Sequence, residues 1–249
     1  MSRWISGEIV KLHQWSDELY SIFIKAEVEP FIAGQFTQIG LGEEERPLFR
    51  PYSFVNAPED PILEFYFNLI PQGALTEKLV ALKPSDPIWV ARKASGRFTA
   101  VSLDPASYLW CFATGTGLGV FLSILKTHEP WEKFDKVFLV HSVPTAQFQS
   151  HHPLIQSFKE NHPDQFQFIP IVTRETVPHT FQERMTTMIE TQTLEKQLGL
   201  EISSQTSQVM LCGNPHMVQE MRALFQARGM NIRIPNKGGQ VTIESYWKD

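Results

Sequence analysis

The sequence predicts two domains, an antiparallel β-barrel over residues 1–101 followed by a doubly wound, parallel-sheet α/β domain over residues 102–249. Short segments with alternating apolar residues fill the first hundred positions, and Pro and Gly break them at regular intervals. Such a pattern is typical of antiparallel strands. Beyond residue 102, continuous apolar runs alternate with helical segments, as in a parallel sheet that is covered on both faces.

The length, composition and charge limit the classes of protein to which the chain can belong. The chain has 249 residues, which is enough for two domains, and 42% of them are hydrophobic. The net charge is −5, so we expect no binding to nucleic acid. No window approaches the roughly 18 apolar residues of a membrane span, and the first residues lack the apolar core of a signal peptide. We therefore expect a cytoplasmic protein, and we expect it to be a monomer.

Metal chemistry is not expected. Cys111 and Cys212 are the only cysteines, whereas an iron–sulfur cluster needs four ligands. The eight histidines show no metal-binding spacing, and His151-His152-Pro153 is typical of the start of a helix.

Six strands and one helix are predicted in the first domain. The strands lie near 5–12, 19–26, 35–41, 50–56, 63–69 and 87–92. Within 63–69, the apolar and polar residues alternate, which predicts a strand with one exposed face. Gly73-Ala74-Leu75-Thr76 leads into a helix with leucines at helical spacing up to Leu82, and the amides at its start could receive a phosphate.

Four buried strands and four helices are predicted in the second domain. The strands lie at 108–113, 137–140, 166–172 and 209–212, and the helices at 119–127, 153–161, 181–190 and 215–228. The last helix has the clearest signals, since Asn214 can cap it, Pro215 suits its first turn and Gly229 can end it.

Arg50-Pro51-Tyr52-Ser53 lies in a predicted strand and carries binding chemistry. Arginine can neutralise a diphosphate, tyrosine offers a flat face to a ring, and serine offers a hydroxyl to the edge of that ring. These groups suit a flavin dinucleotide. The alternative is an ordinary strand with an exposed arginine, and this stretch alone does not decide between them.

A glycine-rich loop, Gly115-Thr116-Gly117-Leu118-Gly119, follows the first parallel strand and opens a helix. Its glycines would let the backbone approach a ligand, and the helix start favours phosphates. Cys212 also ends a strand and precedes a helix, so both loops would line one crevice. The alternatives are a tight turn without a ligand, and a Cys212 that is simply a buried apolar residue.

The second domain carries cations where a nucleotide would bind. His141-Ser142-Val143-Pro144 ends the second strand without the acid that usually holds an NAD ribose. Thr173 and Arg174 follow the third strand, and Arg184 lies ten residues later. Arginines there would suit the 2′-phosphate of NADP(H), unless Arg174 pairs with Glu175 or faces solvent.

Together these motifs make the chain resemble the bacterial branch of the ferredoxin/flavodoxin–NADP⁺ reductase family. The resemblance runs from Trp4 to Trp247. The matching segments are Arg50–Ser53, Gly73–Thr76, Gly115–Gly117, Thr173–Glu175, Cys212–Met217 and Val241–Trp247.

The resemblance implies a flavoprotein oxidoreductase that transfers electrons between NADP(H), FAD and a ferredoxin or flavodoxin. It implies catalytic roles for three residues, with Ser53 near flavin N5, Cys212 beside the nicotinamide and Glu244 in proton relay. The residues implied in FAD binding are Arg50, Pro51, Tyr52, Ser53, Tyr66, Phe67, Asn68, Ala74, Leu75, Thr76, Thr116, Tyr246 and Trp247. Those implied in NADP binding are Gly115, Gly117, Val143, Pro144, Thr173, Arg174, Arg184, Gly213, Asn214 and Met217.

Three positions depart from the family pattern. Val120 stands where members usually have proline, Pro144 stands where bacterial relatives often have an arginine, and Lys248-Asp249 extend past the terminal aromatic residue.

Two other functions remain open at this point. One is a reductase component that feeds an oxygenase or another acceptor, and the other is a non-catalytic flavin or nucleotide sensor.

Overall fold

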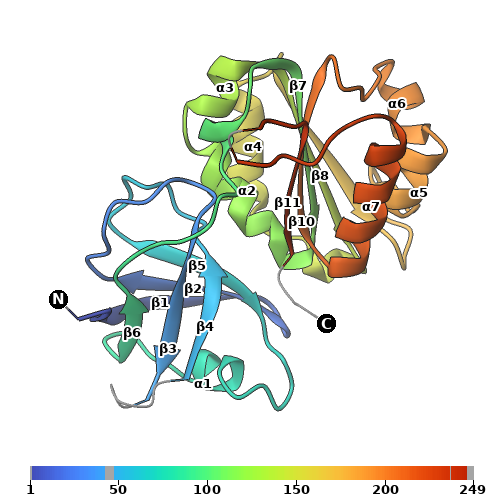
Figure 1. Cartoon of the computed structure of the whole chain (residues 1–249). Coiled ribbons are helices and arrows are strands. Elements are labelled where there is room, and N and C mark those ends of the chain that lie inside the picture. Colours follow the sequence, from blue (N-terminus) through green and yellow to red (C-terminus); the bar gives the residue numbers. More distant parts are fainter. Residues whose placement is uncertain (1, 43–47, 236, 246–249) are drawn as a thin grey trace. The chain divides into compact units, whose positions relative to one another are not determined.

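The computed structural model describes residues 2–42, 48–235 and 237–245. The chain divides into two compact units (Figure 1). The first comprises Met1–Thr99 and Leu122–Thr127, and the second Ala100–Phe121 and His128–Asp249. None of the helices in the described ranges is long and apolar enough to cross a membrane.

The first unit is an antiparallel sheet of six strands in the order β4-β3-β6-β1-β2-β5, which confirms the predicted class of this half. An antiparallel bridge between Phe54 and Phe65 joins the two edges of the sheet. The elements are β1 (Trp4–Ser16), β2 (Leu19–Lys25), β3 (Phe36–Leu41), β4 (Leu48–Ser53), β5 (Leu63–Asn68), α1 (Thr76–Val80) and β6 (Pro87–Ala91).

Strand β5 differs from the prediction of one exposed face. Leu63 to Phe67 are all buried, including Glu64 and Tyr66. The Glu64 carboxylate accepts a hydrogen bond of 2.8 Å from Ser21 Oγ, and a buried carboxylate needs such a partner. The polar side of β5 is therefore enclosed by the unit instead of facing water.

The segment Leu122–Thr127 belongs to the first unit although it lies far along the chain. Ser123 Oγ donates to Asn56 O at 2.7 Å, and Lys126 Nζ donates to Val55 O at 3.0 Å. Both carbonyl groups belong to buried residues, so these side chains satisfy acceptors that would otherwise be orphaned.

The second unit is a parallel sheet of five strands in the order β11-β10-β7-β8-β9, which confirms the predicted α/β class. The strands are β7 (Ala106–Thr114), β8 (Phe134–Val143), β9 (Phe166–Val172), β10 (Ser207–Gly213) and β11 (Val241–Ser245). The helices are α2 (Leu118–Leu125), α3 (Glu129–Lys133), α4 (His152–Asn161), α5 (Met185–Glu190), α6 (Thr193–Leu198) and α7 (Pro215–Ala227). The strand order reverses between β7 and β10, and ligands bind at such switch points.

Helices α5, α6 and α7 cover one face of this sheet, and α3 and α4 lie on the opposite side (Figure 1). The core beneath α5–α7 is aromatic and aliphatic. Its sheet members include Trp110, Phe112, Phe138, Val140, Ile169, Ile171, Val209 and Leu211. Asn214 caps α7 as predicted, because its side chain accepts hydrogen bonds from the amides of His216 and Met217.

Helix α5 is shorter than the predicted 181–190. Phe181 forms a bridge to β9 at Ile171, and its carbonyl accepts a hydrogen bond of 2.8 Å from Val172 N. Residue 181 is therefore extended, and the helix begins only at Met185. Helices α3 and α6 and strand β11 were not among the predicted elements.

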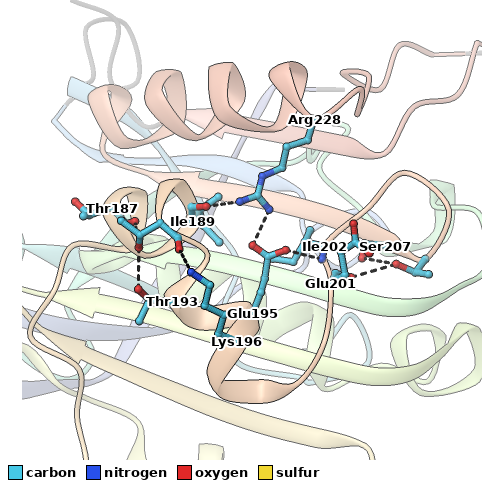
Figure 2. A network of polar contacts seen from close by, with 11 residues as sticks. Thr187, Ile189, Thr193, Glu195, Lys196, Glu201, Ile202, Ser207 and Arg228 are labelled. Carbon is cyan, nitrogen blue, oxygen red and sulfur yellow. Dashed lines mark hydrogen bonds and ion pairs between the residues drawn. The ribbon is translucent and has the colours of Figure 1, made fainter.

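A buried ion pair ties together the three helices on the aromatic face (Figure 2). Arg228, which follows α7, donates from Nη1 to Glu195 Oε2 of α6 at 2.7 Å. Its Nη2 donates to Ile189 O at the end of α5. The second Glu195 oxygen accepts from Ile202 N at 2.9 Å, so both oxygens of this enclosed carboxylate are used.

Candidate functional site

Strand β4 carries the first group of predicted binding residues, and its pairing with β3 fixes their positions. Tyr52 lies opposite Thr37, and Ser53 opposite Phe36. The Arg50 guanidinium is exposed, and its Nη1 donates to Phe49 O at 2.7 Å. Within the described residues this guanidinium contacts a neutral carbonyl and forms no ion pair, so its charge is available for an anion.

Tyr52 is half-buried and stays uncharged. Its ring lies edge-on to Phe67, with 6.0 Å between the ring centroids. Burial raises the pKa of Tyr52 to about 12, although the nearby Arg50 cation acts in the opposite direction. A neutral phenol ring that is supported on one side by core aromatics can serve as a stacking surface.

The turn before α1 presents backbone donors. Across the portion of the chain that the structure describes, the amides of Ala74, Leu75 and Thr76 have no hydrogen-bond acceptor. Thr76 Oγ1 accepts from Ile70 N at 3.1 Å and so closes the turn. Unpaired amides on successive residues, together with the Arg50 cation, suit a diphosphate.

Strand β5 contributes less side-chain surface than its predicted role suggests. Tyr66 and Phe67 are buried, and only Asn68 is partly exposed. A ligand could therefore reach Tyr66 and Phe67 mainly through their backbone.

In the second unit, the loops that follow β7 and β10 are packed against each other. A Cβ on Gly117 would lie 2.6 Å from Cys212 O, and one on Gly213 would lie 2.1 Å from Thr114 Oγ1. Asn214 N donates to that same hydroxyl at 2.8 Å. The predicted glycine loop and the Cys212 segment thus form one continuous wall at the switch point, and neither glycine can carry a side chain.

Gly115 leaves this wall open on one side. Its backbone has φ +52°, and a Cβ built on it would meet no atom within 4 Å. A glycine that opens into free space, in a loop that leads into α2, suits the phosphates of a dinucleotide. Thr116 lies in the same 3₁₀ turn and is buried.

Cys212 and Glu244 are brought together by the pairing of β10 with β11, where they are register partners. The Cys212 side chain is fully buried. Burial also raises the pKa of Glu244 to about 7, so its carboxyl can hold and release a proton near neutrality. Tyr246, Trp247 and Lys248-Asp249 lie outside the described residues.

The loops after β8 and β9 are joined by backbone hydrogen bonds. Thr173 N donates to Val143 O at 3.0 Å, and Arg174 N donates to Pro144 O at 2.9 Å. Glu175 accepts a hydrogen bond from Ala146 N, so its carboxylate is used to hold the loop after β8. Within the described ranges Arg174 forms no ion pair, and the alternative pairing with Glu175 is not seen.

Arg184 is exposed and directly precedes α5, after the segment that Phe181 joins to the end of β9. Arg174 follows the same end of β9, so the fold brings both predicted phosphate ligands to one edge of the sheet. Met217 differs, because its side chain is buried in the core beneath α7. Its amide donates to the Asn214 cap, so the structure leaves Met217 no evident contact for a ligand.

Two contributors were not predicted. Thr114 links the two loops through its hydroxyl, and His141 Nε2 lies 2.9 Å from Gly115 O. A polar residue at the end of an otherwise apolar strand is the only signal that the sequence offers for either.

Comparison with known proteins decides the family. Residues 112–223 match the oxidoreductase NAD-binding domain model. The chain is 38% identical over 249 residues to the flavodoxin/ferredoxin–NADP reductase of Buchnera aphidicola subsp. Baizongia pistaciae, covering 99% of this chain and 100% of that protein. It is 38% identical over 248 residues to the enzyme of the same name from Escherichia coli K12, with the same coverage. The chain belongs to the flavodoxin/ferredoxin–NADP reductase family.

A solved structure agrees with this membership. The ferredoxin NADP⁺ reductase of Neisseria gonorrhoeae, with bound FAD and NADP, matches with a TM-score of 0.93 and 25% identity over 99% of this chain and 100% of that chain. The predicted family, the two-part fold, the oxidoreductase class and the cofactors FAD and NADP(H) are thereby confirmed for this reductase. The roles of its individual residues are not tested by these comparisons.

Proposed function

We propose that this reductase exchanges hydride between NADP(H) and FAD, and single electrons between FAD and a ferredoxin or flavodoxin. In this proposal residues 1–101 bind FAD and residues 102–249 bind NADP(H). The observation that carries it is the wall at the switch point, where the glycine loop packs on the backbone of Cys212 and Gly213. This wall gives phosphates a place to bind and fixes a buried thiol beside them.

The first unit holds the flavin through charge and backbone donors. Arg50 and the amides of Ala74, Leu75 and Thr76 would neutralise the FAD diphosphate, since these donors have no other strong acceptor in the described residues. The neutral ring of Tyr52 would lie on the isoalloxazine, and Ser53 would offer its hydroxyl near N5. Bound FAD supplies the redox chemistry, because a flavin takes up two electrons at once and returns them singly.

The second unit orients the coenzyme. Gly115 and Gly117 would let the pyrophosphate approach the start of α2, and Arg174 and Arg184 would bind the 2′-phosphate. Cys212 would lie next to the nicotinamide at the end of β10, where its side chain is fully enclosed. Glu244, protonated or charged near pH 7, would supply and remove the proton that accompanies hydride.

The test uses the purified protein. We expect a yellow protein that releases FAD, and not FMN, on denaturation. NADPH should bleach its flavin absorbance, and a ferredoxin or flavodoxin should then restore it. A protein that takes up no FAD, or whose flavin NADPH does not reduce, would contradict the proposal. If NADPH reduced the flavin but neither carrier reoxidised it, the reaction with NADPH would be supported and the proposed protein partner would be wrong. Light scattering after gel filtration would check the monomeric state.

A further inference from the structure

His141 is a buried polar residue at the end of β8 that none of the roles above uses. It is 2% exposed and pairs in register with Ala113 on β7. Its neighbour Val140 lies in the core beneath α5–α7, so the His141 side chain points to the opposite face of the sheet. From there its Nε2 reaches Gly115 O at a distance of 2.9 Å.

The chemistry of this contact fixes the state of the imidazole. A carbonyl oxygen only accepts, so Nε2 must carry the hydrogen and donate it. Burial lowers the pKa of His141 to about 4, against the opposing effect of the bond to Gly115. The charges that His151 and His152 can carry at the start of α4 also oppose a cation there. The donor is therefore a neutral imidazole throughout the physiological pH range.

The bond also fixes the direction of one peptide group. In a planar trans peptide the C=O and N–H groups point in opposite directions. Gly115 O accepts from Leu118 N as well as from His141, so it is held on the side of β8. The amide of Thr116 must then point away from His141. Without the imidazole only the bond from Leu118 N would hold this carbonyl among the described residues, and Gly115 adds no side-chain restraint because it has no Cβ and no atom lies within 4 Å of where one would be.

We propose that His141 is a positioning residue of the nucleotide site, which holds the Gly115–Thr116 peptide so that the Thr116 amide faces the phosphates of NADP(H). The inference rests on the proposed function, because it takes the glycine loop to be the phosphate-binding loop. In this proposal His141, on the neighbouring strand β8, acts through the loop and does not itself touch the ligand.

Three variants of the FAD-loaded protein test this role. His141→Leu removes the donor, and His141→Gln keeps an amide nitrogen at a similar reach. Val137 is buried on the same face of β8, far from the loop. Val137→Ala therefore controls for a loss of packing that does not affect the hydrogen bond to Gly115. One net hydrogen bond corresponds to about tenfold in affinity. We therefore expect His141→Leu to weaken NADP⁺ binding, measured by calorimetry, about tenfold, and the other two variants to change it less than about twofold.

Two further readouts separate positioning from stability. His141→Leu should raise the KM for NADPH about tenfold with kcat nearly unchanged, and its FAD content should equal that of the intact protein. Nitrogen-15 NMR of the intact protein should show His141 as the neutral imidazole with hydrogen on Nε2 between pH 5.5 and pH 8. This measurement tests the hydrogen bond to Gly115 even if His141→Leu does not fold.

Three results would overturn the inference. The first is an unchanged NADP⁺ affinity in His141→Leu, and the second is a loss in His141→Gln or Val137→Ala as large as the loss in His141→Leu. The third is an imidazole without hydrogen on Nε2. If the intact protein bound no NADP⁺ at all, the proposed function itself would fail, which is a distinguishable outcome.

Discussion

Cys212 and Glu244 lie opposite each other on the neighbouring parallel strands β10 and β11. Paired positions place their side chains on one face of the sheet, at the carboxyl end of the strands. The buried Cys212 side chain and a carboxyl whose pKa is raised to about 7 therefore share the end of the sheet where the glycine loop begins.

Glu244→Gln should change how the stability of the folded chain depends on pH. Burial raises the pKa of Glu244 from 4.5 to about 7, so between these values the folded chain keeps a proton that the unfolded chain has lost. Stability therefore falls as the pH rises through this window. At pH 8 the variant should exceed the intact protein by about 2–3 kcal/mol in free energy of unfolding, and near pH 4 the two should agree. Urea unfolding at both pH values checks this.

The matched control is Glu220→Gln, on the exposed side of α7. It should alter the stability little at either pH. A difference between Glu244→Gln and the intact protein that stays constant from pH 4 to pH 8 would show that Glu244 titrates normally.

Cys212→Ala should slow the reduction of bound flavin by NADPH and leave the FAD content unchanged. The alanine keeps the backbone against which Gly117 packs and removes only the enclosed sulfur atom. We expect at least about a tenfold loss of rate, corresponding to about 1.4 kcal/mol in the barrier, in stopped-flow measurements.

Cys111→Ala is the control, because Cys111 is equally buried on the adjacent strand β7. It should cost similar stability with no effect on the rate. If Cys212→Ala destabilised the protein but reduced its flavin at the normal rate, Cys212 would be an ordinary core residue.

NADPH should be preferred over NADH although Pro144 replaces one expected arginine. A charge-assisted contact to a phosphate contributes roughly 1.5–3 kcal/mol, so losing one costs about ten- to hundredfold in affinity. Arg174 and Arg184 remain, however, both exposed at the same edge of the sheet. The double variant Arg174→Ala/Arg184→Ala removes two such contacts, so it should lower kcat/KM for NADPH at least about a hundredfold and leave NADH nearly unaffected.

Arg222→Ala, which removes an exposed arginine from α7, controls for the loss of charge. An intact enzyme that prefers NADH would refute the assignment of this phosphate site. So would a double variant that still prefers NADPH.

Electron transfer to an acidic partner should depend on Arg92 and Lys93. Lys93 is exposed and lies 3.8 Å from Glu29, and Arg92 Nε donates to the neutral carbonyl of Ser2 at 3.3 Å. Arg97, four residues after Lys93 in the sequence, is also exposed. Partner-dependent turnover should fall as salt shortens the screening length from about 30 to about 10 Å. Arg92→Glu/Lys93→Glu should lower the turnover at low salt.

The matched double charge reversal Lys159→Glu/Arg222→Glu lies on helices of the other unit and should have a smaller effect. If the turnover rate depended neither on salt nor on the charge reversal at Arg92 and Lys93, this surface would be ruled out for docking.

Glu195→Gln should destabilise the protein because it leaves the Arg228 cation enclosed without its counter-charge. Removing one partner of a buried pair costs about 3–5 kcal/mol, and we expect somewhat less here because Arg228 is partly accessible. Lys93→Gln, which breaks the exposed pair with Glu29, should cost under about 1 kcal/mol. Urea unfolding measures both. Equal losses would mean that the Glu195–Arg228 pair contributes no more than a surface contact.

Much of the fold could be predicted because burial leaves a clear periodic pattern. The run Leu109–Ala113 is apolar throughout because both of its faces are covered, and Asn214-Pro215 marks the start of α7. The short helices α3 and α6 carry too few residues for a period to show. The burial of Glu64 depends on Ser21, which is 43 residues away, and no local pattern contains that information.

The same limit applies to the site. Residues in local motifs, such as Arg50, Gly117 and Arg174, could be proposed from the sequence. Thr114 and His141 act through hydrogen bonds to segments 100 and 26 residues away along the chain. Only the strand order brings those segments together.

The return of Leu122–Thr127 to the first unit affects how this chain can be recombined. Exchanging the flavin-binding half between relatives by a single crossover near residue 100 would separate Asn56 O and Val55 O from Ser123 and Lys126, which donate to them. A chimera would keep those bonds only if the six-residue insert travelled with residues 1–99. Residues 1–99 are therefore not a self-contained module, because two of their buried carbonyl groups depend on donors from beyond the boundary near residue 100.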